Sequence, residues 1–252
     1  MKTILAISLT SILALPLASQ ANDWVGDITA SEDRVEVGQI PNIQWNVSYP
    51  VDDVEDVIEI DEEEITPKRC LTMSVRLLGA SWSNDRNFFY VDGDLYINGG
   101  KEDLFYGYHQ QIYPQSVVFE QMVEPGDTIG AGARGSMSLH DNNHYGNADW
   151  STYHTTWSDS PNVVLLKNGD DAPQLSTSYA IQKTVADHLA PYMDASTGKM
   201  VLGPRDVVYL FDFNDRDSSG FDLQDLCILI TFTDINCDGS DPSSDDGGAD
   251  VP

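Results

Sequence analysis

Oxygen-bearing side chains crowd one short stretch of the chain, residues 212–225, and this composition suits the binding of a cation. Within it, Asp215, Asp217 and Ser219 occupy alternate positions and Gly220 follows them. Alternate side-chain oxygens can converge on one Ca2+ ion, and a glycine permits the sharp turn that this needs. The stretch therefore predicts a calcium site, with an acidic turn that only contacts solvent as the alternative. The predicted ligands are Asp215, Asp217, Ser219, Asp222 and Asp225.

The spacing D-x-D-x-S-G from Asp215 to Gly220 matches the first half of an EF-hand-type loop. In such a loop the twelfth position carries a bidentate Glu, whereas this chain has Leu226 there. Asp222 and Asp225 would then supply the missing carboxylates from another direction. The match favours calcium and leaves the full coordination open.

A second acidic group lies at residues 234–245, where the pattern D-x-N-x-D-G recurs. This segment resembles the calcium loops of thrombospondin type 3 and dockerin repeats. The resemblance implies bound structural calcium, with a short Asp in the twelfth position. The implied ligands are Asp234, Asn236, Asp238 and Asp245. From Asp241 onward Pro, Ser, Gly and Asp dominate, so a disordered acidic tail is the alternative.

Residues 140–157 are rich in Asn, Gly, His and aromatic residues and show no regular period. We expect a long irregular loop here, and such loops in compact domains are often functional. Its histidines could bind a transition metal together with a neighbouring carboxylate. The residues concerned are His140, His144, His154, Asp141 and Asp149. Aromatic rings beside Asn and Asp also suit a sugar-binding surface, and a loop packed against the domain is the alternative. The candidate ligand-binding residues are Tyr145, Trp150, Tyr153 and Trp157.

Two predicted strands within residues 206–232 place the first acidic stretch at the end of a hairpin. Val207, Tyr209 and Phe211 alternate along the first strand, and residues 226–230 form an uninterrupted apolar run. Such a run is typical of a strand that is covered on both faces. The segments GPRDVVYLFDF and FDLQDLCILITF resemble the C-terminal strand pair of secreted bacterial proteins of unknown function. The resemblance implies a secreted β-rich domain and no particular activity.

Alternating apolar residues and turn residues predict further strands along the chain. We expect them at residues 34–37, 43–49, 71–77, 88–91, 95–97, 117–119, 129–134, 162–167 and 200–202. The pair 88–91 and 95–97 flanks Asp92-Gly93, which predicts a hairpin turn. One amphipathic helix is expected within residues 176–193, interrupted near Pro191. Together these elements predict an all-β fold, a mostly antiparallel β-sandwich, jelly-roll-like, with one short helix.

The N-terminus predicts export. Lys2 precedes an apolar run that ends at small residues, so residues 1–21 are expected to be a signal peptide, with the mature protein extracellular or periplasmic. A β-sandwich domain is expected at 22–233 and an acidic tail at 234–252. The formal net charge of −28 makes nucleic acid a poor partner, and no later apolar run is long enough for membrane insertion.

Two further features concern charge and covalent links. Residues 52–64 contain nine acidic residues, which suits an edge strand and loop protected against edge-to-edge pairing, with calcium or a basic partner as the alternative. Cys70, Cys227 and Cys237 allow one intramolecular disulfide in an oxidising compartment. A bridge between Cys70 and Cys227 is possible if their strands are neighbours, and Cys237 could instead link two chains.

These observations favour a non-enzymatic secreted protein, stabilised by calcium, that serves adhesion, glycan binding or a surface structure. Its expected partner is a glycan or another surface protein. A secreted hydrolase that acts on polysaccharide through paired carboxylates is the first alternative. A filament or matrix subunit is the second. The motifs G-x-S-x-G, H-E-x-x-H and the Walker loop are missing from the sequence, which disfavours serine esterases, zinc proteases and nucleotide enzymes.

Overall fold

The structure is a computed structural model that describes residues 25–30, 43–48, 53–138, 149–158, 161–177 and 179–239. The chain divides into two compact units, Met1–Val51 and Asp52–Pro252. In the first unit, strands β1 (Val25–Ala30) and β2 (Ile43–Ser48) pair antiparallel. The strand expected at 43–49 is therefore confirmed. The strand expected at 34–37 and the signal peptide expected at 1–21 lie outside the described residues.

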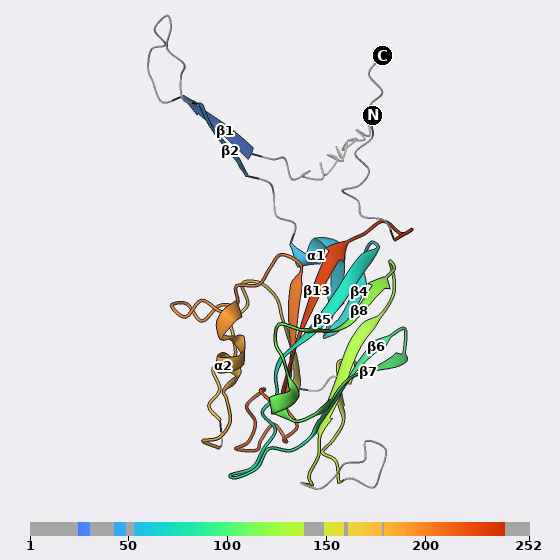
Figure 1. The fold of residues 1–252 in the computed structure, drawn as a ribbon, viewed down its shortest axis with the longest axis vertical. Helices are drawn as coiled ribbons and strands as arrows, with labels where there is room; N and C mark the ends of the chain where they lie inside the picture. Colours follow the sequence, from blue (N-terminus) through green and yellow to red (C-terminus); the bar gives the residue numbers. More distant parts are fainter. Residues whose placement is uncertain are drawn as a thin grey trace, which may run out of the picture. The chain divides into compact units, whose positions relative to one another are not determined.

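The second unit is an antiparallel β-sandwich built from two sheets (Figure 1). One sheet, here the β13 sheet, has the order β11 (Val163–Leu166), β12 (Asp206–Phe211), β13 (Leu226–Asp234), β5 (Leu71–Gly79), β8 (Val117–Val123). The other, the β6 sheet, has the order β3 (Ile58–Asp61), β4 (Glu64–Pro67), β9 (Ile129–Gly135), β6 (Val91–Ile97), β7 (Gly100–Gly107). Strand β10 (His154–Thr155) also pairs with β9. This architecture confirms the expected fold class.

The hairpin formed by β12 and β13 lies at the centre of the core, as its apolar runs predict. Tyr209, Phe211 and Ile228 point into the cluster between the two sheets. Leu210 and Leu229 belong to a second cluster on the outer face, beneath helix α2 (Val185–Leu189). Figure 1 shows α2 on the side of the sandwich away from β6 and β7. Both strands are covered on both faces because each face has its own apolar layer.

The prediction of a hairpin turn at Asp92-Gly93 is wrong. Residues 91–97 form one continuous strand, and the pairing of β6 with β7 shifts between Gly93 and Asp94 as a β-bulge. The turn lies instead at Asn98-Gly99, whose φ angles are 51° and 75°. Two successive residues with positive φ are what a tight turn between twisted strands needs.

The helix expected within 176–193 is shorter than the sequence pattern suggested. Helix α2 begins at Val185 because the Thr184 hydroxyl accepts a hydrogen bond from the Asp187 N–H, and the Asp187 carboxylate accepts one from the Thr184 N–H. It continues into a 3-10 turn, η2 (Ala190–Tyr192), which contains Pro191. Residues 200–202 form no strand, and only isolated bridges join Met200 and Lys199 to other segments.

Two smaller elements complete the second unit. Helix α1 (Val54–Val57) lies in the acidic segment 52–64, and β3, which follows it, is an edge strand as expected there. A 3-10 turn, η1 (His109–Gln111), follows β7. Among the residues that the structure describes, no helix is long and apolar enough to cross a membrane.

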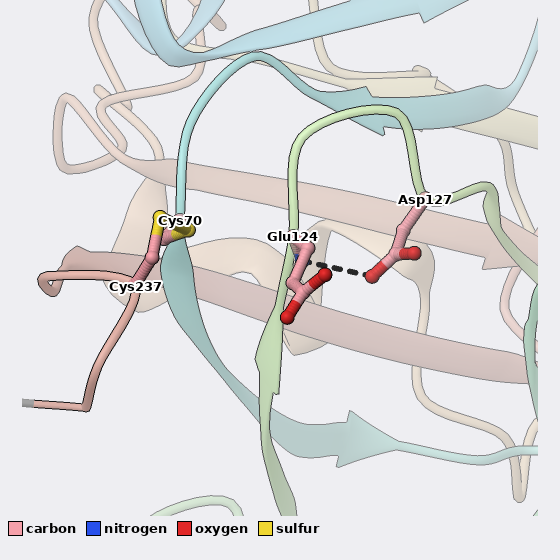
Figure 2. Close-up of a disulfide and its surroundings, with 4 residues drawn as sticks. All are labelled: Cys70, Glu124, Asp127 and Cys237. Carbon is pink, nitrogen blue, oxygen red and sulfur yellow. Dashed lines mark hydrogen bonds between the residues drawn. A yellow bond between two sulfur atoms is a disulfide. The ribbon is translucent and has the colours of Figure 1, made fainter.

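A disulfide joins Cys70 to Cys237 across a sequence separation of 167 residues. Figure 2 shows it where the chain enters β5, beside the turn that holds Glu124 and Asp127. The proposed Cys70–Cys227 bridge is wrong although β5 and β13 are neighbours, because their antiparallel register sets Cys227 opposite Gly79, at the far end of β5. The link between chains through Cys237 is also wrong, and residues 235–239 are held against the sandwich.

Candidate functional site

Three buried carboxylates meet where the β12–β13 hairpin opens into its loop. Asp212 follows β12 directly, and Asp222 and Asp225 precede β13. Ligand oxygens of the three side chains lie within 4.8 Å of one another, and all three side chains are buried. Asp222 and Asp225 belong to the set expected from the sequence. Asp212 was missed as a ligand because it lies outside the alternate spacing of the loop.

Backbone N–H groups hold this cluster in place. Asp212 Oδ2 accepts hydrogen bonds from the N–H groups of Asp222 and Leu223, and Asp212 Oδ1 accepts one from Asn214. Leu223 has a φ of 58°, in the left-handed region that a branched side chain rarely adopts. Asp225 Oδ2 accepts from the Phe213 N–H at 2.7 Å. The loop backbone thus wraps around the Asp212 carboxylate at the cost of local strain.

Two oxygens at the cluster have no hydrogen-bond partner among the described residues. One is Asp225 Oδ1 and the other is Gln224 Oε1, and both side chains are fully buried. The Gln224 amide lies at the cluster, because its Nε2 donates to Asp222 Oδ2 at 2.9 Å. A buried acceptor without a donor costs about 1–3 kcal/mol. Both oxygens thus lack the partner that a bound cation would supply.

Electrostatic repulsion makes the cluster unstable as three bare anions. Burial, and then the charges of Asp212 and Asp222, raise the pKa of Asp225 well above its ordinary value. Cys227 is also fully buried, and its burial, followed by the charges of Asp225 and Asp222, raises the pKa of its thiol. Among the described residues neither Asp212 nor Asp225 forms an ion pair. Either a proton or a bound cation must relieve the repulsion.

The donor set fits calcium. Ca2+ binds carboxylate and amide oxygens at about 2.3–2.6 Å, so two oxygens on one ion are at most about 5.2 Å apart. The separation within the cluster lets one ion contact all three carboxylates. Asp212, Asp222 and Asp225 would hold the ion, and Gln224 would offer an amide oxygen. Bound there, calcium would supply positive charge that neutralises the carboxylates.

The other ligands expected from the first loop lie away from this cluster. Asp215, Asp217 and Ser219 are exposed to solvent in the loop. The structure therefore brings together two of the five expected residues, Asp222 and Asp225, and adds Asp212 to them.

The described residues of the second expected calcium loop, 234–239, make contacts that stabilise the sandwich. Asp234 is the last residue of β13, and its carboxylate forms ion pairs with Arg69 at 2.8 Å and Arg205 at 2.9 Å. Asn236 lies next to the disulfide-bonded Cys237, and the Asn236 carbonyl accepts the Gly239 N–H. Asp238 is exposed, and Asp245 lies outside the described residues. Asp234 is thus already neutralised by two arginines.

An aromatic row crosses the outer face of the β6 sheet. The side chains of Tyr106 on β7, Asp92 on β6 and Arg134 on β9 lie side by side, because these residues are paired in register. Arg134 Nη2 lies 2.8 Å from Asp92 Oδ2, and its guanidinium carbon lies 4.3 Å from the centre of the Trp150 ring. Tyr90 stacks on Tyr106 with ring centres 5.2 Å apart. The result is a half-exposed band of rings around an ion pair in which Asp92 is buried and Arg134 is partly exposed.

A polar network beside this row ties residues 149–158 to the sheet. Tyr153 donates a hydrogen bond to Asp94 Oδ2 at 2.6 Å, and Lys101 forms an ion pair with the same oxygen at 3.0 Å. Burial raises the pKa of Asp94, against the opposing effects of Tyr153 and Lys101. The Tyr153 hydroxyl also lies 2.8 Å from that of Tyr96. Tyr153 therefore serves to position this segment.

The remaining sugar-binding and metal candidates of this segment are spread out. Trp157 is 46% exposed and packs edge-on against Tyr96, and Trp150 covers Arg134. Tyr145, His140, His144 and Asp141 lie outside the described residues. His154 lies on β10, where burial lowers its pKa while Asp212 and Asp215 oppose that shift. His154 belongs to the aromatic segment and lies near the carboxylate cluster.

No family model, curated protein or solved structure matches this chain.

Proposed function

We propose that this chain is a non-enzymatic secreted β-sandwich that binds glycans through the aromatic row and is stabilised by Ca2+ at Asp212, Asp222 and Asp225. The observation that carries the proposal is the half-exposed band formed by Tyr90, Tyr106 and Trp150 around the Asp92–Arg134 ion pair. Flat rings stack on the apolar faces of sugar rings, and the partly exposed Arg134 guanidinium can donate hydrogen bonds to their hydroxyls.

The calcium centre lies near the segment that carries Trp150. Asp212 and Asp215 interact electrostatically with His154, which pairs with Ala133 next to Arg134. In this proposal calcium is structural and takes no part in bond cleavage.

The test is retention of the purified protein on a panel of marine and plant polysaccharides, measured by affinity electrophoresis. We expect Trp150→Ala and Tyr106→Ala each to weaken retention about tenfold, which is about 1.4 kcal/mol. Tyr113→Ala is the matched control, because Tyr113 is 69% exposed and lies outside the row. Melting temperatures measured in parallel show whether each variant is folded.

Three results would count against glycan binding by this row. They are an absence of retention on every polysaccharide, unchanged retention in both row variants, and an equal loss in Tyr113→Ala. Release of shortened glycans by the wild-type protein would instead support the hydrolase alternative.

A further inference from the structure

A pocket at the end of β5, which shares no lining residue with the aromatic row, collects basic side chains. It has a volume of about 270 Å³ and lies between the end of β5, turn η1 and the segment that leads into α2. Its size is just below the roughly 300–1,000 Å³ of typical ligand pockets, so it suits a small molecule. The lining residues that could contact a ligand include Phe88, His109, Ile112, Ile181, Lys183 and His188.

The charge of this pocket is opposite to that of the chain. The chain has 41 acidic and 13 basic residues, yet the described residues that line the pocket include two histidines and a lysine and no Asp or Glu. Lys183 forms no ion pair among the described residues, although Lys68, Lys101, Lys167 and Lys199 all bind oxygen atoms nearby. An unpaired ammonium beside two imidazoles favours an anionic ligand.

The two imidazoles are held in fixed positions. His188 Nε2 lies 2.9 Å from Ser81 Oγ, and the ring fits against Gly79, where a Cβ atom would come within 2.0 Å of Nδ1. Ser81 is only 1% exposed, so this pair orients the imidazole and does not present a nucleophile to solvent. The His109 ring lies over Phe88 with ring centres 3.7 Å apart.

His109 Nδ1 indicates where a ligand would bind. This nitrogen is buried and has no hydrogen-bond partner among the described residues. A buried polar atom of this kind costs about 1–3 kcal/mol, so a movement of the ring that turns Nδ1 toward a ligand oxygen would be favourable. Apart from Ser81, the rest of the lining is apolar and includes Phe88, Ile112 and Ile181.

We propose that this pocket binds a small organic carboxylate, with the carboxylate oxygens at Lys183 and His109 and the apolar body against Phe88, Ile112 and Ile181. The site is separate from the glycan-binding row and from the calcium centre, so the proposal stands independently of both.

The proposal predicts a pH dependence. Burial, and then Lys183, lower the pKa of His109, and the same causes lower the pKa of His188 to about 4, with Asp187 opposing and His109 adding to the shift. A bound carboxylate favours the protonated imidazoles and raises both pKa values. Binding should therefore strengthen as the pH falls from neutral toward the histidine pKa values.

The experiment uses benzoate as the probe and the full chain as the protein. Ligand-detected NMR gives the Kd, and 15N shifts of the imidazoles report the contact. We expect benzoate to bind about tenfold more tightly than neutral benzamide, and its affinity to rise at lower pH. Benzoate should shift the His109 resonances more than those of His154, which lies on β10.

Two variants and one control make the test specific. Lys183→Gln and His109→Gln should each weaken benzoate binding about fivefold while leaving benzamide unchanged. Lys199→Gln is the control, because Lys199 is an exposed lysine that binds Asp171 and the Gly169 carbonyl. Equal affinity for benzamide and benzoate, full affinity in both pocket variants, or no saturable binding of benzoate would each overturn the proposal.

Discussion

Replacing Asp225 by Asn separates the two ways in which the carboxylate cluster can be neutralised. Without a cation, the raised pKa of Asp225 means that the folded protein keeps a proton which the unfolded chain loses above its ordinary pKa of 3.8. Between these two pKa values the folded state binds more protons than the unfolded chain. The free energy of unfolding therefore falls by about 1.4 kcal/mol for each unit of rising pH. This loss begins near the ordinary pKa and ends at the raised folded pKa. Asn cannot titrate, so Asp225→Asn should lack this slope.

Bound calcium reverses the effect of Asp225→Asn on the free energy of unfolding. A cation that binds only the folded wild type at a hundredfold excess over its Kd adds about 2.7 kcal/mol. For a chain of this length that corresponds to about 5–11 °C in Tm, at about 2–4 °C per kcal/mol. Asp225→Asn removes a ligand and should lose most of this gain. The same substitution should thus raise stability at neutral pH in chelator and lower it in calcium.

Urea unfolding, followed by tryptophan fluorescence at about pH 5, 6 and 7 with calcium or chelator, measures both effects. Asp217→Asn is the control, because Asp217 is exposed in the same loop and lies outside the cluster. Its effect should stay within about 0.5 kcal/mol in every condition. Parallel pH profiles of wild type and Asp225→Asn in chelator would refute the buried-proton argument. An equal calcium gain in the two proteins, or its loss in Asp217→Asn, would refute the assignment of the ligands.

Two further predictions concern the sandwich itself. Tyr153→Phe removes the 2.6 Å hydrogen bond to the buried Asp94 carboxylate and should lower the free energy of unfolding by about 1–3 kcal/mol, as measured in urea; no change would contradict a structural role for this hydroxyl. The double substitution Cys70→Ser and Cys237→Ser opens a loop of 167 residues and should cost about 2–5 kcal/mol under oxidising conditions. A midpoint equal to that of the oxidised wild type would contradict the intramolecular bridge.

The strands were predictable where burial alone specifies them. β12 and β13 have apolar residues on both faces, so their position in the core follows from the sequence whatever their neighbours are. The β6–β7 hairpin was harder, because Asp92-Gly93 and Asn98-Gly99 carry the same kind of turn signal. Gly93 lies inside the strand, where a Cβ atom would come within 2.7 Å of Leu226. The contact with Leu226 joins residues far apart in the sequence, so no local pattern contains it.

The start of helix α2 is the opposite case, because a local sequence signal for it was present. The prediction followed the apolar spacing instead of that signal. Apolar spacing suggested a helix from residue 176, but Thr184 and Asp187 form a capping box that starts it at Val185. Ile181, which belonged to the apolar pattern, is 40% exposed and lines the basic pocket instead. Where a capping box and apolar periodicity disagree, the hydrogen bonds of the first turn decide where the helix begins.

The carboxylate cluster follows from the hairpin more than from the loop. Alternate spacing assumes that neighbouring residues fold around an ion, and it selects Asp215, Asp217 and Ser219, which are exposed. The pairing of Phe211 with Leu226 instead closes the hairpin and sets Asp212 beside Asp225 at its end. Two carboxylates next to the last pair of a buried hairpin must face each other in a medium of low polarity, which requires a proton or a cation. An antiparallel pairing in the register Phe211–Leu226 is thus sufficient to identify this pair of residues.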